Sequence, residues 1–236
     1  MITDFPVYIL VPPVAFLLGG LWAVLRSPGA KLNSAVQHLA AGLIFAAVAV
    51  ELLPQEKGKS PLMLIIGFAV GTLFMLLLEL LIERVRSNEG GSDGNLSFVV
   101  LVGVDIAIDG LLIGLAYTLG SKQGFLVTSA LAVEFLSLGL TSTDSMAERL
   151  PGKRGRLVVT GCLALLPIVG ALTGMQAFSG LSQGWISMVT AFAIAALLYL
   201  VTEELLRKAH KLVSTHYGAT LFFIGFLAMF VIDLIS

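Results

Sequence analysis

The 236-residue chain has little charge: Asp, Glu, Lys and Arg make up 12% of it, whereas 57% of its residues are hydrophobic. Its mean hydropathy is +0.98. Soluble domains carry about a quarter of their residues as charged side chains. The composition therefore excludes an ordinary soluble globular protein, and a net charge of −1 gives no electrostatic reason to expect nucleic-acid binding.

Cysteine is nearly absent too, because Cys162 is the only one in the chain. A single cysteine excludes an internal disulfide framework and a metal cluster built on several thiolates. Any chemistry in this chain therefore has to be sought in other side chains.

Apolar runs long enough to cross a bilayer recur along the sequence. A hydrocarbon core of roughly 30 Å requires about 20 apolar residues per helix, and a helix satisfies its own backbone hydrogen bonds in lipid. The first run has no Lys or Arg before it, so we interpret it as a helix and not as a cleaved signal peptide. The sequence predicts an all-α membrane protein, a bundle of eight transmembrane helices near Phe5–Leu25, Ser34–Leu53, Leu62–Ile82, Leu96–Leu119, Gly124–Thr143, Leu157–Phe178, Trp185–Thr202 and Tyr217–Ile235.

The basic residues predict the orientation of this bundle. Eleven of the fourteen Lys and Arg fall in the first, third, fifth and seventh loops, and the others are Lys57, Lys59 and Lys122. Because positive loops stay in the cytoplasm, we expect both termini outside. We treat residues 1–236 as a single eight-helix transmembrane domain with a flexible cytoplasmic loop near 83–95, and we expect a prokaryotic inner membrane.

Three carboxylates lie where charge is disfavoured. Asp105 and Asp109 are in the middle of the fourth predicted span and Glu134 is in the middle of the fifth. A charge at this depth costs at least about 2.5 kcal/mol, so it is expected to face a cavity or a partner. A spacing of four residues places both aspartates on one helix face, and Gly103 and Gly110 form a small-residue face that permits close packing.

A polar stripe continues from Glu134 along the fifth span. Ser137, Thr141 and Ser145 follow at steps of three and four residues, so all four side chains share one helix face. Hydroxyls in helices also bond to their own backbone, which is the simpler explanation for each one alone. Their alignment with Glu134 indicates a path from the midplane to the cytoplasmic end.

The three acids could instead form a protonated, hydrogen-bonded structural network. Three negative charges repel one another, and Lys and Arg occur only near the ends of the predicted spans. A cation therefore has to reach these acids from elsewhere, as protons or as a metal ion.

These residues resemble the ZIP family of divalent metal transporters, which has eight helices with both termini outside. The fourth helix of that family typically reads His-Asn-x-x-Glu-Gly, and here Asp105-Ile106-Ala107-Ile108-Asp109-Gly110 has the same frame. Further similarity lies in Leu52-Leu53-Pro54, Val169-Gly170-Ala171, and Thr202-Glu203-Glu204-Leu205 followed by His210.

The resemblance implies a metal site formed by Asp105, Asp109 and Glu134. It also implies that the family's second metal site is missing, because Ile106, Phe135 and Leu138 stand where its ligands would be. All-oxygen ligands suit harder ions than histidine does, so Mn²⁺ and Fe²⁺ join zinc, the family default, as expected substrates. Glu203 and His210 are further candidates for the exit path.

The expected partners are lipid, the transported metal ion and a second copy of the chain, with no permanent cofactor. Three alternatives remain open. Intramembrane proteases use two aspartates from two helices, whereas Asp105 and Asp109 share one helix, so we expect no enzyme. A ZIP-like scaffold or metal sensor without transport would explain the missing ligands. A pathway for protons or monovalent ions would use the same acids.

Overall fold

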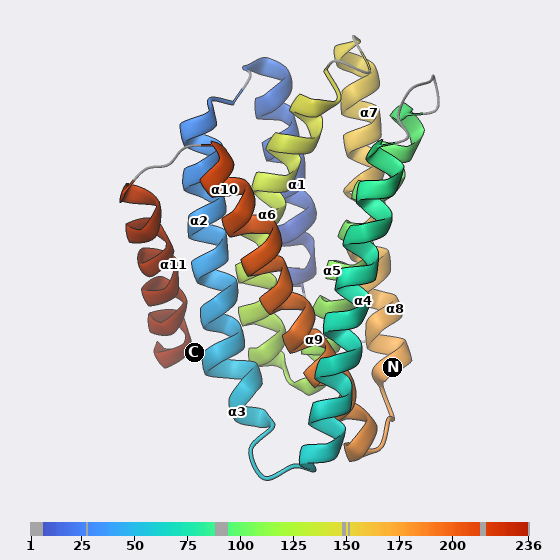
Figure 1. Cartoon of the computed structure of the whole chain (residues 1–236), viewed down its shortest axis with the longest axis vertical. Coiled ribbons are helices and arrows are strands. Elements are labelled where there is room, and N and C mark those ends of the chain that lie inside the picture. Colours follow the sequence, from blue (N-terminus) through green and yellow to red (C-terminus); the bar gives the residue numbers. More distant parts are fainter. Residues whose placement is uncertain are drawn as a thin grey trace.

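The computed structural model describes residues 7–26, 28–87, 94–147, 150, 152–212 and 216–235. Every regular element within these ranges is helical, and no strand occurs among them. Eight of the helical stretches are long and apolar enough to cross a membrane. The prediction of an all-α bundle with eight spans is confirmed (Figure 1).

Several spans consist of more than one helical element. The order along the chain is η1 (Val7–Leu10), α1 (Val11–Leu25), α2 (Ala30–Ala47), η2 (Val48–Leu52), α3 (Leu53–Gln55), α4 (Pro61–Ser87), α5 (Gly94–Leu119), α6 (Ser121–Ser145), α7 (Lys153–Leu163), α8 (Leu166–Phe178), α9 (Gln183–Tyr199), η3 (Leu200–Leu206), α10 (Arg207–Leu212) and α11 (His216–Ile235).

The helices extend beyond the apolar runs from which they were predicted. Helix α4 continues to Ser87 and α5 begins at Gly94, so both enter the segment predicted as a loop near 83–95, and residues 88–93 lie outside the described residues. The seventh span also continues past Thr202, to Lys211. Hydropathy marks the part of a helix that lies in lipid, whereas polar residues at its ends are good helix formers in water.

Helix α6 lies at the centre of the bundle. Its most apolar window is 72% buried, against 17% for the windows of α4 and α11. Helices α1, α2 and α5 pack around α6, while α8 packs on α5, α9 on α4 and α11 on α2. The outward faces of α4 and α11 carry exposed large apolar residues such as Leu77 and Leu227, as expected for helices in contact with lipid.

Glycines allow α5 and α8 to approach each other closely. A Cβ atom added at Gly110 would lie 2.7 Å from the carbonyl oxygen of Pro167, and one at Gly174 would lie 2.7 Å from that of Leu111. The predicted small-residue face of the fourth span is therefore confirmed as a packing face. With α8 behind it, α5 presents its opposite face, which carries the aspartates, towards α6.

Within the described residues, two spans contain π-helical segments, which are often found at functional sites. The segment η2 carries Glu51, which is buried and accepts a hydrogen bond of 2.5 Å from Gln123 of α6. The segment η3 carries Glu203 and Glu204. Each π-helical turn contains more residues than an α-helical turn, so it shifts the direction of the side chains that follow it.

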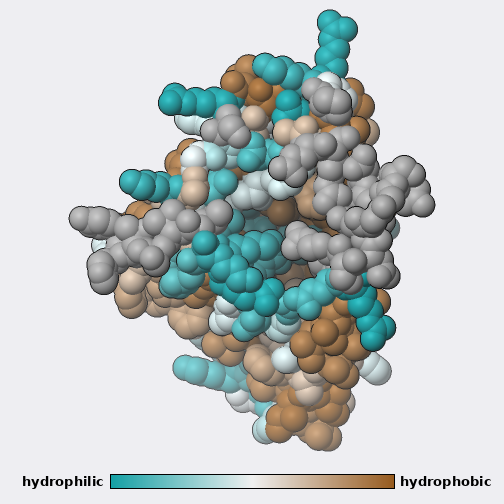
Figure 2. Space-filling model, turned by 45° about the horizontal axis from the view of Figure 1, so that its top comes forward, coloured by the Kyte–Doolittle hydropathy of each residue, from teal (hydrophilic) through white to brown (hydrophobic). Residues whose placement is uncertain are grey.

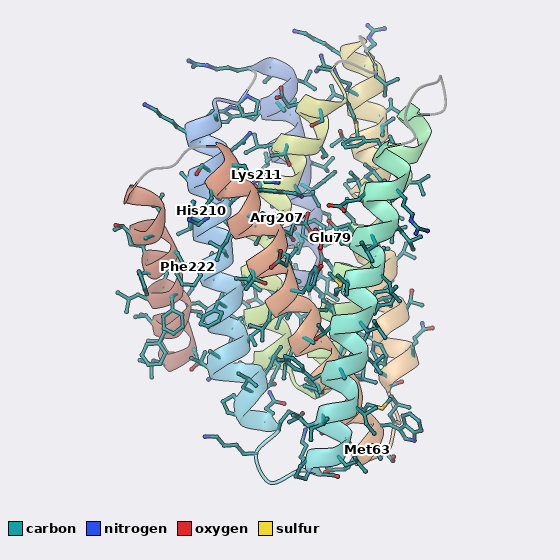
Figure 3. The ribbon with its side chains drawn as sticks, in the orientation of Figure 1. Met63, Glu79, Arg207, His210, Lys211 and Phe222 are labelled. Atoms are coloured by element: carbon teal, nitrogen blue, oxygen red, sulfur yellow. The ribbon has the colours of Figure 1, made fainter. Side chains whose placement is uncertain are left out.

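One ion-pair cluster ties α4 to the seventh span. Glu79 of α4 accepts hydrogen bonds from the hydroxyl of Tyr199 and from the guanidinium of Arg207. Figure 3 shows Glu79 and Arg207 lying between α4 and α10. The contacts hold α10 against the bundle, and with it the residues that α10 contributes to the site.

Candidate metal centre

The three acids predicted from the sequence come together. Asp105 and Asp109 lie one turn apart on α5, and Glu134 lies on the adjoining α6. One carboxylate oxygen of each residue lies within 4.8 Å of the others. Asp109 and Glu134 are 3% and 2% exposed, whereas Asp105 is half-buried. We call this group the carboxylate triad.

The carboxylate triad has unsatisfied oxygen atoms. Oδ2 of Asp109 and Oε2 of Glu134 are buried, and no N–H or hydroxyl group among the described residues donates a hydrogen bond to either oxygen. A buried carboxylate oxygen without a partner is costly. Two oxygens that each lie about 2.1 Å from one ion are at most about 4.2 Å apart. The triad oxygens lie within 4.8 Å of one another, so small side-chain rotations would let them enclose a cation.

A water-sized passage leads to the triad from one end of the bundle. A cavity of about 480 Å³ lies between α2, α5, α6 and the seventh span. Figure 2 shows hydrophilic side chains gathered at this end, around a hollow. The residues lining the cavity are Asn33, Gln37, Phe98, Leu101, Val102, Asp105, Leu138, Thr141, Ser142, Asp144, Ser145, Glu204, Lys208 and Lys211.

The cavity reaches the bundle end that was predicted to be cytoplasmic. Asn33 is in the first turn of α2 and Ser145 is the last residue of α6. These helix ends adjoin the link from α1 to α2 and the link from α6 to α7, at the top of Figure 1. Asp105 lines the inner part of the cavity, and Asp109 follows one turn deeper on α5.

On the other side of the triad the bundle is closed. Apolar side chains of η2, α5, α6 and α9 meet there, including Leu52, Leu112 and Leu197, and they leave no room for a water molecule between them. Leu52, Leu112 and Leu197 are all buried. The described residues therefore show a water-sized cavity on one side of the triad and close apolar packing on the other.

The polar stripe of α6 lies partly on the cavity wall. Thr141 and Ser145 line the cavity, whereas Ser137 is buried and does not. The hydroxyl of Thr141 donates a 3.0 Å hydrogen bond to the backbone carbonyl of Ser137. Ser142, which the sequence analysis did not single out, also lines the cavity, and its hydroxyl donates to the carbonyl of Leu138.

Glu203 and His210 lie away from the cavity. Both are exposed and neither lines it. The ring of His210 packs edge-on against that of His38, with 5.1 Å between the ring centroids. His38 is buried, and its Nδ1 lies 2.8 Å from the carbonyl oxygen of Ser34. The histidines therefore pack where α10 crosses α2.

The seventh span contributes Glu204, Lys208 and Lys211 instead. All three line the cavity, and Lys208 forms an ion pair with Glu204. The apolar run that predicted this span ends at Thr202, so the prediction that Lys208 lies in a loop was wrong. Their spacing of i, i+4 and i+7 puts them on one helix face, and this was the signal available in the sequence.

Two amide side chains of α2 also line the cavity and were not singled out from the sequence. Asn33 and Gln37 are 7% and 3% exposed. Their atoms Oδ1 and Oε1 have no hydrogen-bond partner among the described residues. Their spacing of four residues, near the start of an apolar run, was the only sequence signal for them.

The positions of the missing second site are apolar in the structure. Ile106 and Phe135 are completely buried in the hydrophobic core, where Phe135 packs edge-on against Phe16. Leu138 forms part of the cavity wall. Among the described residues, the triad is the one group of three or more acids, histidines or cysteines close enough to hold a metal ion.

Compared with known proteins, the chain matches no family model, and no curated protein is similar enough to count as a match. What is established is a membrane protein with eight spans and a buried group of three carboxylates.

Proposed function

We propose that this protein transports a divalent metal cation across the membrane, as its resemblance to the ZIP family implies. The ion would bind to the carboxylates of Asp105, Asp109 and Glu134. The single observation that carries the proposal is the carboxylate triad itself, three acids within 4.8 Å of one another at mid-span with two unpartnered oxygens. Apolar residues at these positions would avoid the cost of burying the charges.

The cavity supports transport over a purely structural role. A scaffold does not need a water-sized passage that ends at a buried acidic group, but a transporter does. The passage is open at one end and closed at the other, as alternating access requires of one of its states. We assign this state to the cytoplasm-facing form, from which an ion taken up outside would leave past Thr141 and Ser145.

The ligand chemistry bears on which metal is carried. The triad offers oxygen atoms only, which favours Mn²⁺ over softer ions, although carboxylates also bind zinc. Zinc remains the family default, with Mn²⁺ and Fe²⁺ as the other candidates. The amide oxygens of Asn33 and Gln37 add two neutral oxygen ligands along the cavity.

We propose transport and not catalysis. Asp109 and Glu134 do come from two helices, as the paired acids of an intramembrane protease would, but Asp105 adds a third carboxylate within the same 4.8 Å. Three converging carboxylates are a better arrangement for a cation of charge +2 than for a pair of acids that share one proton.

The test is metal uptake into proteoliposomes by wild-type protein and by Asp109→Asn, with Zn²⁺, Mn²⁺, Fe²⁺ and Cd²⁺ as substrates. We expect selective flux that Asp109→Asn abolishes. The matched control is Glu56→Gln, since Glu56 is also a buried acid but is paired with Lys59, outside the cavity. It should keep its flux.

Absence of flux for every metal, from folded wild-type protein, would refute the transport proposal. Proton flux that needs no metal would favour the proton pathway, and metal binding without flux would favour the sensor.

A further inference from the structure

We propose that Lys208 is a tethered cation of the transport site: in the metal-free protein its ammonium group offsets part of the negative charge of Glu204 and Asp105, and an incoming divalent cation has to displace it. This inference rests on the proposed function. It supplies from within the chain the positive charge that the sequence analysis expected only from outside.

The position of Lys208 carries the proposal. Its ammonium Nζ forms an ion pair with Oε1 of Glu204, one turn before it in the same span. Both side chains line the cavity, together with Asp105 of α5. Lys208 therefore shares the cavity with an acid of another helix, Asp105, and not only with its helical neighbour.

An ordinary surface ion pair would look different. Such a pair faces bulk water, and its contribution to stability is usually below about 1 kcal/mol. The Lys208 side chain is 51% exposed, but its ion pair with Glu204 opens into the cavity, whose wall includes apolar residues such as Leu101 and Leu138. Charges interact more strongly there than in bulk water.

The lysine side chain suits a displaceable cation. It carries a compact charge on a flexible four-carbon stem, so it can move between neighbouring carboxylates without movement of the backbone. A metal ion of charge +2 is attracted to the same acids about twice as strongly as a unit charge at equal distance. Lys208 would thus reduce the negative charge of the empty site and be released when the ion arrives.

Lys211 provides a matched comparison on the same helix. It also lines the cavity, three residues further along α10, in the last turn before Leu212 (Figure 3). Both lysines are exposed, but Lys211 lies nearer the end of the helix and therefore nearer the cavity mouth. Removing its charge should therefore have much less effect on an ion bound at the triad.

The experiment is a calorimetric titration of purified full-length protein in detergent with Cd²⁺, Zn²⁺ and Mn²⁺. It compares the wild type with Lys208→Gln, Lys208→Arg, Lys211→Gln and Asp109→Asn. We expect Lys208→Gln to bind metal at least about fourfold more tightly, which is the effect of removing a unit charge about 10 Å from a divalent ion in bulk water, and more where the dielectric constant is lower. Lys208→Arg keeps the charge and should bind like the wild type, and Lys211→Gln should stay within about threefold of it.

The outcomes separate this inference from the proposed function. Unchanged or weaker binding in Lys208→Gln, beside lost binding in Asp109→Asn, overturns the role of Lys208 alone. Equally tight binding in Lys208→Gln and Lys208→Arg also overturns it, because the effect would not be one of charge. If Asp109→Asn binds as tightly as the wild type, or if neither the wild type nor Lys208→Gln binds metal, both proposals fail. Binding by Lys208→Gln where the wild type shows none supports both.

Discussion

Neutralising one acid of the carboxylate triad should stabilise the metal-free protein. Two unit charges 4.8 Å apart repel each other by about 3.5 kcal/mol at an effective dielectric constant of 20. Asp109→Asn removes two of the three pairwise repulsions. Proton binding already relieves part of this cost in the wild type, so we expect a net gain of about 1–3 kcal/mol.

The same substitution should abolish stabilisation by metal. A ligand at 100 times its dissociation constant stabilises the folded state by about 2.7 kcal/mol. Thermal melting in detergent, with chelator and then with excess Mn²⁺ or Zn²⁺, measures both effects. We expect Asp109→Asn to melt at a higher temperature than the wild type in chelator and to show no shift with metal.

Glu56→Gln is the control with the opposite expected sign. Glu56 is 5% exposed, lies 2.8 Å from Nζ of Lys59 and accepts a hydrogen bond from Ser187. Removing one partner of a partly buried ion pair leaves the Lys59 charge uncompensated and also weakens the bond from Ser187, so this variant should lose stability, by about 1–3 kcal/mol. It should keep the shift with metal. A lower melting temperature for Asp109→Asn in chelator, or a retained metal shift, would refute the reasoning.

Two further predictions concern the α5–α8 contact and the cavity wall. In the melting assay, Gly174→Ala should destabilise the protein by more than about 2 kcal/mol, because the new Cβ would lie 2.7 Å from the Leu111 carbonyl oxygen. The control is Gly161→Ala, whose new Cβ would have no atom within 4 Å and which should be neutral or stabilising. Thr141→Val should slow metal uptake several-fold without changing the melting temperature, because it removes a hydroxyl from the cavity wall. Thr202→Val removes an exposed hydroxyl with the same backbone bond to the preceding turn and should transport normally; equal rates for the two threonine variants would contradict a role for the wall.

The spans were predictable because each depends on local sequence. A run of about 20 apolar residues is stable in lipid only as a helix, whatever its neighbours are. The shared face of Asp105 and Asp109 follows from helix geometry alone. So does the small-residue face of α5, although only the structure identifies α8 as the helix that packs on it.

The cavity was only partly predictable. Thr141 and Ser145 line it, as the polar stripe indicated, whereas Glu203 and His210 do not. The prediction for the seventh span assumed that it ends with the apolar run. A π-helical segment at Leu200–Leu206 and the continuing helix α10 bring Glu204 and Lys208 to the cavity instead.

The sequence alone determined the number of spans, the depth of the three acids and the faces on which they lie, because hydropathy and helix periodicity act within single segments. Tertiary structure decided which helices adjoin, and therefore that Glu134 meets Asp105 and Asp109, and that Lys208 shares their cavity. Contacts between helices far apart in the chain depend on how side chains of different sizes fit together. That fit is a property of pairs of surfaces, and no single segment contains it.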